Sequence, residues 1–152
     1  MVKTLFETRQ REEVKVRIRQ LRLDSQRQWG TMTVAQAVTH CAVGLEIATG
    51  ERVPSKLALP FRILGKIVKP MALGNDTPMR RNAPTAKEFL VKDHQDLEPE
   101  QERLCALIDR FAAAGPAGCT AQPHSFFGRL TPEEWAELMY KHLDHHLRQF
   151  GV

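Results

Sequence analysis

Cysteine is scarce in this chain, and the few cysteines are poorly placed to pair with one another or to bind a metal. Cys41, Cys105 and Cys119 are odd in number, widely spaced and free of any CxxC pair. A dispersed set of this kind argues against both a disulfide framework and a thiolate zinc site. The composition favours a reducing compartment, and we expect a cytoplasmic protein.

Long apolar runs and a large excess of one charge are also missing. No stretch approaches the roughly 18 uncharged residues of a membrane-spanning helix, and the first residues carry charges where a signal peptide would need an apolar run. The formal net charge is only +4, with 22 basic and 18 acidic residues interspersed. Neither nucleic acid nor a membrane is therefore indicated as a partner. The densest basic stretch, Lys15 to Arg22, alternates with apolar residues and is interpreted as the solvated face of a helix.

What the sequence does contain is apolar residues at helical spacing, in a chain of 152 residues that is the size of one ordinary domain. Four segments show this spacing, and none shows the convincing alternation of a strand. Two of them begin with a capping box, Thr33 with Gln36 and Thr131 with Glu134. The expected helices run to about Leu23, from Thr33 to Gly50, from Leu97 to Ala114 and from Pro132 to Phe150.

A long connection separates the second expected helix from the third. From Glu51 to about Gln95 it carries five prolines, which together argue against any long regular helix. Short links favour antiparallel neighbours, whereas a connection of this length can return the chain to the end from which it started. The sequence thus predicts one all-α domain over residues 1–152, a four-helix bundle that runs up-down-down-up with a long crossover between helices 2 and 3.

A short helix is expected within this crossover, over Phe61 to Lys69. Arg62, Lys66 and Lys69 fall on one side of it and apolar residues lie elsewhere, a pattern that also suits a helix on a membrane surface. We interpret the segment more simply as a cover over the bundle.

Histidines on the last helix indicate a metal site. At about 100° per residue, His142 and His146 share the inward face of this helix with Trp135, and their i, i+4 spacing puts the Cβ atoms about 5–6 Å apart. Both imidazoles can then reach one ion at the distance of about 2.0–2.1 Å that zinc needs. An HxxxH pair alone is a weak signal, because inward histidines are often core residues bonded to a neighbour. Gln149 lies on the same face, whereas His145 lies at its edge and is the weaker ligand.

A third histidine strengthens this hypothesis. In the up-down-down-up order, the start of the second helix meets the end of the last one. His40 and the pair His142 and His146 then both lie about 10 Å below that end, at about 1.5 Å per residue. His40 sits on the flank of its helix's apolar stripe and must face the last helix across that flank. Gly44, one turn further on, either leaves room for an ion or allows tight helix packing.

Further side chains are expected around the same end of the bundle. Trp29 in the first connection, and Asp93 and His94 before the third helix, are candidates for the pocket or for contact with the ligands. His94 could be a fourth ligand, although a surface position is the simpler interpretation. His124 belongs to the connection at the opposite end, and Cys41 is expected in the core.

These residues resemble a known superfamily. Residues 33–40 and the later run HLDHHLRQ, residues 142–149, resemble the first-histidine helix and the terminal HxxxHxxQ helix of the DinB/YfiT-like proteins. The run HSFFGRLTPEEWAELMYKHLDHHLRQFGV, residues 124–152, looks like the C-terminal signature of one branch, a family of unknown function. The resemblance implies a four-helix fold, frequent homodimers and a metal held by three histidines, which match His40, His142 and His146. Arg148 stands where the superfamily commonly has a glycine, and this leaves the role of Gln149 open.

Three neutral imidazoles leave at least one coordination position for water or substrate, which is the layout of a catalytic rather than a structural site. A divalent ion, zinc or nickel, would bring the pKa of a bound water to about 7 or hold a substrate thiol as its thiolate. Hydrolysis needs a general base near the water, whereas thiol transfer needs only metal activation and a pocket. The superfamily includes members that look like thiol-dependent transferases or isomerases.

We therefore expect a metal-dependent enzyme that acts on a small molecule, either as a transferase that uses a low-molecular-weight thiol or as a hydrolase. The alternative is a binding or stress-response module without catalysis, in which the histidines merely pack or hold a structural metal. If the site binds metal, binding should weaken below about pH 6.5, where free imidazoles protonate and compete with the ion.

Overall fold

The computed structural model describes residues 2–83 and 96–152, and this part of the chain is all-helical, without a strand. The all-α class predicted from the apolar spacing is confirmed. The first helix ends at Gln20 rather than at Leu23, because Leu21 is extended. No helix in the described ranges is long and apolar enough to cross a membrane. The elements are α1 (Thr8–Gln20), α2 (Val34–Ala48), α3 (Leu59–Ala72), α4 (Leu97–Ala114), the 3-10 helix η2 (Gly115–Gly118) and α5 (Pro132–Gln149).

Both capping boxes that the sequence predicts are present. The Thr33 hydroxyl accepts the Gln36 N–H at 3.2 Å, while the Gln36 side chain accepts the Thr33 N–H at 2.9 Å. Thr131 and Glu134 form the same reciprocal pair, at 3.2 and 2.8 Å. These bonds satisfy donors that the first turn of a helix leaves without partners. The starts of α2 and α5 are therefore set locally, and with them the direction of every later side chain on these helices.

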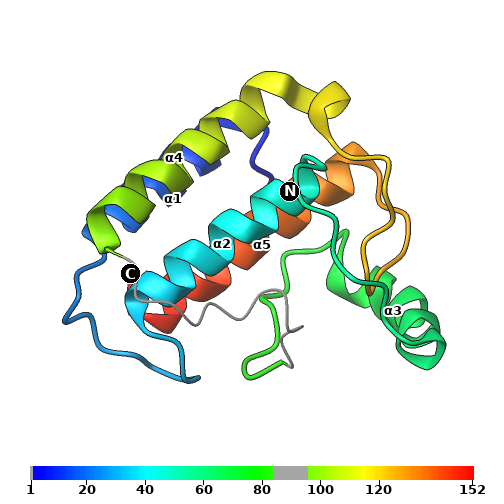
Figure 1. The fold of residues 1–152 in the computed structure, drawn as a ribbon, viewed down its shortest axis with the longest axis horizontal. Coiled ribbons are helices and arrows are strands. Elements are labelled where there is room, and N and C mark those ends of the chain that lie inside the picture. Colours follow the sequence, from blue (N-terminus) through cyan, green and yellow to red (C-terminus); the bar gives the residue numbers. More distant parts are fainter. Residues whose placement is uncertain (1, 84–95) are drawn as a thin grey trace.

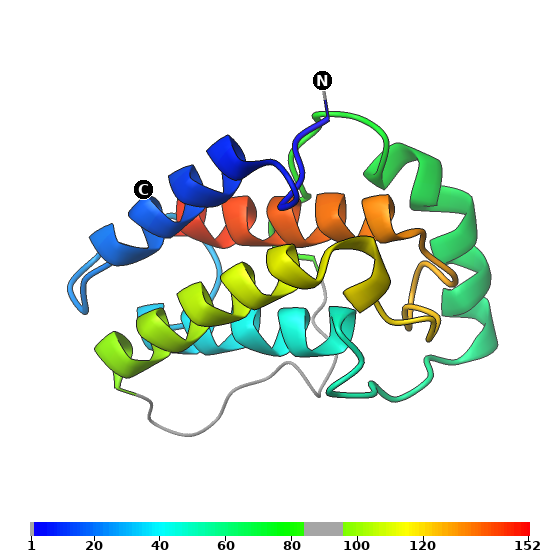
Figure 2. The ribbon, with the colours of Figure 1, turned by 90° about the horizontal axis from the view of Figure 1, so that it is seen from above.

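Helices α1, α2, α4 and α5 pack lengthwise around one apolar core (Figures 1 and 2). Each of α1 and α2 contacts both α4 and α5. Fully burying a large apolar side chain contributes roughly 1.5–3 kcal/mol, so such residues dominate the stability of the packing. The largest that are completely buried come from α1, α2, α4, α5 and the segment before α1, and include Leu5, Ile18, Leu45, Phe111 and Trp135.

Contacts between the helices give their relative directions. Where two helices run parallel, the residue numbers of successive contacts rise along both, and this holds for α2 with α4 and for α1 with α5. For α1 with α4 the numbers rise along one helix and fall along the other, so this pair is antiparallel. Helices α2 and α5 begin at opposite ends of the molecule (Figure 2). The contacts that show this are Thr39–Glu100 and Glu46–Arg103 for α2 with α4, Leu5–Ala136 and Arg17–Asp144 for α1 with α5, and Lys15–Asp109 and Ile18–Gln101 for α1 with α4.

Helix α3 departs from the expectation in length and in environment. It has 14 residues although the prolines of this segment argue against a long helix. Pro60 lies in the first turn, where the missing N–H leaves no bond unmade, and Pro70 lies close to the end. Gly65 is the one buried residue of α3, while Leu64 and Ile67 are 48% and 67% exposed. The interpretation of this helix as an apolar cover over the bundle is therefore wrong for most of its side chains.

Candidate metal centre

His142 and His146 project from consecutive turns of α5. Their ring centroids lie 4.9 Å apart, and the ring planes are nearly perpendicular, at 85°. The residues one and two turns before them on this face, Met139 and Trp135, are 5% and 1% exposed. The face that carries the two histidines is thus the one that α5 turns toward the core.

His40 meets this pair from α2. It is 5% exposed, and its ring centroid lies 4.7 Å from that of His142 and 4.7 Å from that of His146. The Nε2 atoms of His40 and His142 are 2.7 Å apart. One ring nitrogen from each of the three histidines lies within 4.8 Å of the other two. The structure therefore brings together the three side chains selected from the sequence, and the group could hold a metal ion.

Gly44 makes room for a histidine ring rather than for an ion. An ideal Cβ at this position would lie 3.1 Å from Nδ1 and 3.2 Å from Cε1 of His142. Few real Cβ atoms have neighbours this close, so alanine here would push the His142 ring away. Of the two explanations that the sequence allows, close packing of α2 against α5 applies, with His142 as the group that fills the space.

Gln149 holds His146 from the last turn of α5. Its Oε1 lies 2.8 Å from Nδ1 of His146, and its Nε2 donates to the Trp29 carbonyl oxygen at 2.8 Å. A carbonyl oxygen can accept a hydrogen bond but cannot donate one. The Gln149 amide must therefore face the Trp29 carbonyl with its NH2 group and His146 with its oxygen. Nδ1 of His146 therefore carries the proton, and the lone pair of this imidazole is on Nε2.

The first connection packs closely onto Gln149. The Gln28 N–H donates to the Gln149 carbonyl oxygen at 2.7 Å. At Gly30 a Cβ would lie 2.5 Å from Nε2 of Gln149, and the backbone φ of +76° also disfavours any side chain there. The sequence predicted a role for Trp29 in this connection but not for Gly30. The only feature that could have indicated Gly30 is its position next to Trp29.

Burial keeps His142 and His146 neutral. It lowers the pKa of His142 well below the usual value of 6.5, and the nearby His40 and His146 lower it further. Burial also lowers the pKa of His146 to about 3, with His40 adding to this effect and the bond to Gln149 opposing it. Neutral imidazole is the form that binds metal ions, so these two rings need no proton release at neutral pH.

Trp29 and His145 adjoin the cluster on one side. The ring centroid of His145 lies 5.0 Å from that of His146 and 5.5 Å from that of Trp29. The Arg81 guanidinium carbon lies 4.1 Å from the Trp29 ring centroid, a cation–π contact. Burial lowers the pKa of His145, while a hydrogen bond to the backbone of Met79 opposes this. The predicted neighbours Trp29 and His145 thus lie together beside His146.

The remaining candidates lie elsewhere. His94 and Asp93 fall outside the described residues. His124 stands before α5, with its ring centroid 5.5 Å from that of Trp135, and its Nδ1 accepts the N–H groups of Phe126 and Phe127 at 3.1 Å. Cys41 is buried as expected, and burial raises the pKa of its thiol.

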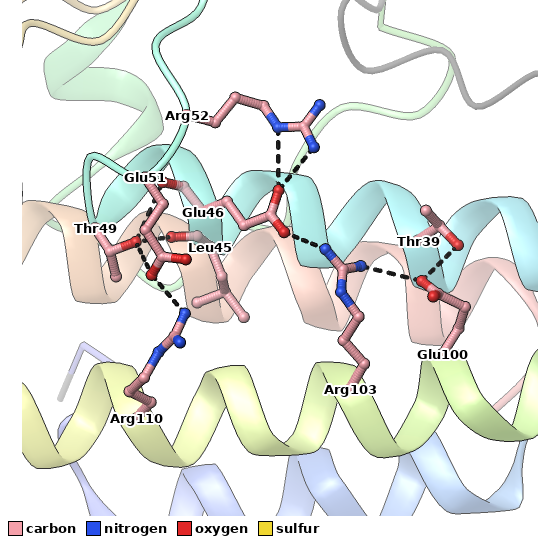
Figure 3. Close-up of polar contacts among 9 residues, drawn as sticks. All are labelled: Thr39, Leu45, Glu46, Thr49, Glu51, Arg52, Glu100, Arg103 and Arg110. Atoms are coloured by element: carbon pink, nitrogen blue, oxygen red, sulfur yellow. Dashed lines mark hydrogen bonds and ion pairs between the residues drawn. The ribbon is translucent and has the colours of Figure 1, made fainter.

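A polar network that the sequence does not indicate fastens α2 to α4 (Figure 3). The Thr39 hydroxyl donates to Glu100 at 2.9 Å, and Arg103 bridges Glu100 and Glu46. Thr39 directs its side chain toward α4, so the next residue, about 100° further round the helix, faces α5. The network thereby orients His40 toward the other two histidines.

One family model matches nearly the whole chain, over residues 4–151, and its description is "Protein of unknown function (DUF1569)". Comparison with curated proteins and with solved structures found no match.

Proposed function

We propose, for a chain that belongs to the DUF1569 family of unknown function, that His40, His142 and His146 bind one divalent metal ion, zinc or nickel. The observation that carries the proposal is the convergence of three ring nitrogens, from two different helices, within 4.8 Å of one another. Burial lowers the pKa of His142 and of His146, which favours the neutral, metal-binding form of both rings.

The orientation of the rings supports binding through Nε2 of each histidine. The Nε2 atoms of His40 and His142 face one another at 2.7 Å, and an ion bound there would displace the one proton that this contact holds. In His146 the bond from Nδ1 to Gln149 leaves the lone pair on Nε2. A partner on the second ring nitrogen orients a metal-binding imidazole and raises its basicity, and Gln149 supplies this for His146.

We further propose that the fold is the DinB-like four-helix bundle with up-down-down-up order. Support comes from the parallel pairs α2 with α4 and α1 with α5, together with the antiparallel pair α1 with α4. A homodimer and a cytoplasmic location remain predictions from the resemblance and the composition.

The site supports metal-dependent chemistry on a small molecule. A divalent ion with three neutral imidazole ligands keeps a position for an exchangeable ligand and lowers the pKa of a water or a thiol there. Beside it, the indole Nε1 of Trp29 is buried without a hydrogen-bond partner among the described residues. A substrate that reached this N–H would meet an unused donor, and the Arg81 guanidinium over the same ring favours a substrate with negative charge.

Transfer of a small thiol is the reaction class that this donor set supports best. The three-residue group contains no carboxylate to serve as a general base. Hydrolysis needs such a base, whereas a thiol whose pKa is already lowered loses its proton to solvent at neutral pH. Hydrolysis stays as a second candidate because His145, neutral and next to His146, could accept a proton from water.

The alternative to an enzyme is a binding or stress-response module without metal, in which the histidines pack against one another. Its support is the 2.7 Å contact between His40 and His142, which satisfies one nitrogen of each ring without any ion.

Spectroscopy of the cobalt-loaded protein separates these functions. We expect Co²⁺ to give the intense visible bands of a four-coordinate site, and a small thiol such as cysteine or glutathione to add a sulfur-to-metal band in the near ultraviolet. Visible bands that a thiol leaves unchanged would contradict thiol transfer and favour hydrolysis. Absence of the visible bands would favour the metal-free module.

A further inference from the structure

Helix α3 carries an unusual share of the exposed apolar surface. Nine large apolar side chains are exposed in the described part of the chain, and six of them belong to this one helix. Single exposed apolar residues need no explanation, but a contiguous set marks a surface that contacts something else. The six are Leu59, Phe61, Ile63, Leu64, Ile67 and Met71.

The attachment of α3 to the rest of the molecule directs this surface outward. Gly65 packs so closely against the Phe126 carbonyl oxygen that no side chain fits between them. Lys69 pairs with Glu134 at 2.7 Å and donates to the Arg129 carbonyl at 2.8 Å. The helix is thus held by its glycine side and its C-terminal half, and it stands at the end of the molecule away from the C-terminus (Figures 1 and 2).

The exposed side chains form a regular stripe. Leu59, Ile63, Ile67 and Met71 follow one another at i, i+4 and are 63%, 51%, 67% and 75% exposed. Residues at this spacing lie one above another on a helix surface. Leu64 broadens the stripe. The four residues and Leu64 are called the α3 stripe below.

The charged residues of α3 and of the segments that flank it in the sequence are of one sign. Residues 52–75 contain five lysines and arginines and no acidic residue. Arg52 and Lys69 pair with Glu46 and Glu134. Arg62 and Lys66, which flank the stripe at i, i+4 from each other, are exposed and make no ion pair with any residue that the structure describes.

We propose that α3 is an interfacial helix that docks this protein onto an anionic membrane surface. An apolar face beside lysine and arginine is the arrangement that inserts into the boundary between headgroups and acyl chains. Cations next to such a face add attraction to anionic lipids. A symmetric dimer through α3 would instead set the same unpaired cations of two copies close to each other, because both partners use the same patch. The membrane is therefore the occupant whose charge complements the helix.

The α3 stripe and the histidine cluster are separate surfaces of the molecule. The C-terminal part of α3 and the residues after it contact α5 through Glu134, Glu137 and Lys141, the last of which directly precedes His142. The stripe itself is exposed to solvent, whereas His142 and His146 lie on the side of α5 that faces the core. Membrane docking therefore does not depend on the proposed metal site, and either proposal can fail without the other.

Co-sedimentation of the full-length protein with vesicles tests this proposal. Binding to vesicles of phosphatidylcholine with phosphatidylserine should exceed binding to pure phosphatidylcholine by at least about tenfold, and should weaken as salt screens the charges. Equal binding to both vesicle types, or to neither, would overturn the proposal. If binding to neither accompanied a concentration-dependent dimer that Ile67→Glu abolishes, a second copy would be the occupant of the stripe.

Matched variants locate the contact. Met71→Glu should reduce vesicle binding at least about tenfold, because it places a charge in the apolar boundary. Leu23→Glu is the control, because Leu23 is as exposed as Met71, at 75%, but lies outside α3. Arg62→Gln with Lys66→Gln should reduce binding about 30-fold. Arg19→Gln with Arg22→Gln removes the same charge at and just beyond the C-terminal end of α1 and should change binding less than about threefold. Equal losses in the test and control variants would contradict docking through α3.

Discussion

Oε1 of Gln149 lies 2.8 Å from Nδ1 of His146, and this one contact ties the proposed metal ligand to the first connection of the chain. The same amide donates to the Trp29 carbonyl, and this determines which of its atoms faces the imidazole. The tautomer of His146 therefore follows from a loop that lies more than a hundred residues earlier in the sequence.

Gln149→Leu should weaken divalent metal binding about 10–100-fold, because His146 loses the partner that orients it. Gln149→Glu keeps an acceptor for Nδ1 and should retain more of the affinity. Competition titrations with a chromophoric chelator measure both variants. Equal affinity of Gln149→Leu and the wild type would show that the contact does not support the ligand.

Gly44→Ala should lower metal affinity without lowering the stability of the metal-free protein to the same degree. Alanine favours a helix over glycine by about 1 kcal/mol, which offsets part of the cost of moving the His142 ring. Urea unfolding of the metal-free protein and metal titration are compared on the same variant. A large loss of stability with unchanged affinity would mean that the contact concerns packing alone.

Much of this site could be predicted from the sequence because its determinants are local. The capping boxes at Thr33 and Thr131 set the starts of two helices, and helical periodicity then brings the histidines to the same side. The support around them could not be predicted, since it depends on contacts between distant segments. The bond between Gln149 and Trp29 is one such contact, and the Arg103 bridge to Glu46 is another.

The exposure of α3 was also beyond the sequence. An amphipathic helix has the same sequence pattern whether its apolar face packs against the bundle or points away from it. What decides is the contact of Gly65 with the Phe126 backbone, which fastens the helix by its smallest residue.

Acid should destabilise the metal-free protein partly through His124. Burial lowers the pKa of His124 to about 4, whereas the unfolded chain has a value near 6.5. The unfolded state therefore binds the proton first. The contribution of His124 to the free energy of unfolding is complete above about pH 6.5 and decreases as the pH falls toward 4. The expected loss from this residue is on the order of 3 kcal/mol by pH 4.

His124→Asn tests this contribution, because asparagine can still accept the N–H groups of Phe126 and Phe127 but does not titrate. Urea unfolding at pH 7 and pH 4.5 should show a smaller difference for the variant than for the wild type. The same pH dependence in both proteins would contradict the assignment.

Metal binding should persist to lower pH than free imidazole predicts. Burial lowers the pKa of His146 to about 3, so we expect proton competition at this ligand to begin below pH 6.5, the value that a free imidazole sets. Titrations at pH 7.0, 6.0 and 5.0 should give affinities that fall less than tenfold per pH unit. A fall of about a hundredfold per unit below pH 6.5 would indicate that two ligands protonate like exposed histidines.

Elemental analysis of the untagged protein, purified without chelator and dialysed against trace zinc and nickel, tests the central claim most directly. The account predicts about one divalent ion per wild-type chain, and less than about a tenth of that in His40→Ala, His142→Ala and His146→Ala. His124→Asn is the matched control and should keep the full content. A wild-type protein without metal, or full metal content in all three alanine variants, would contradict the claim that these histidines form a metal site.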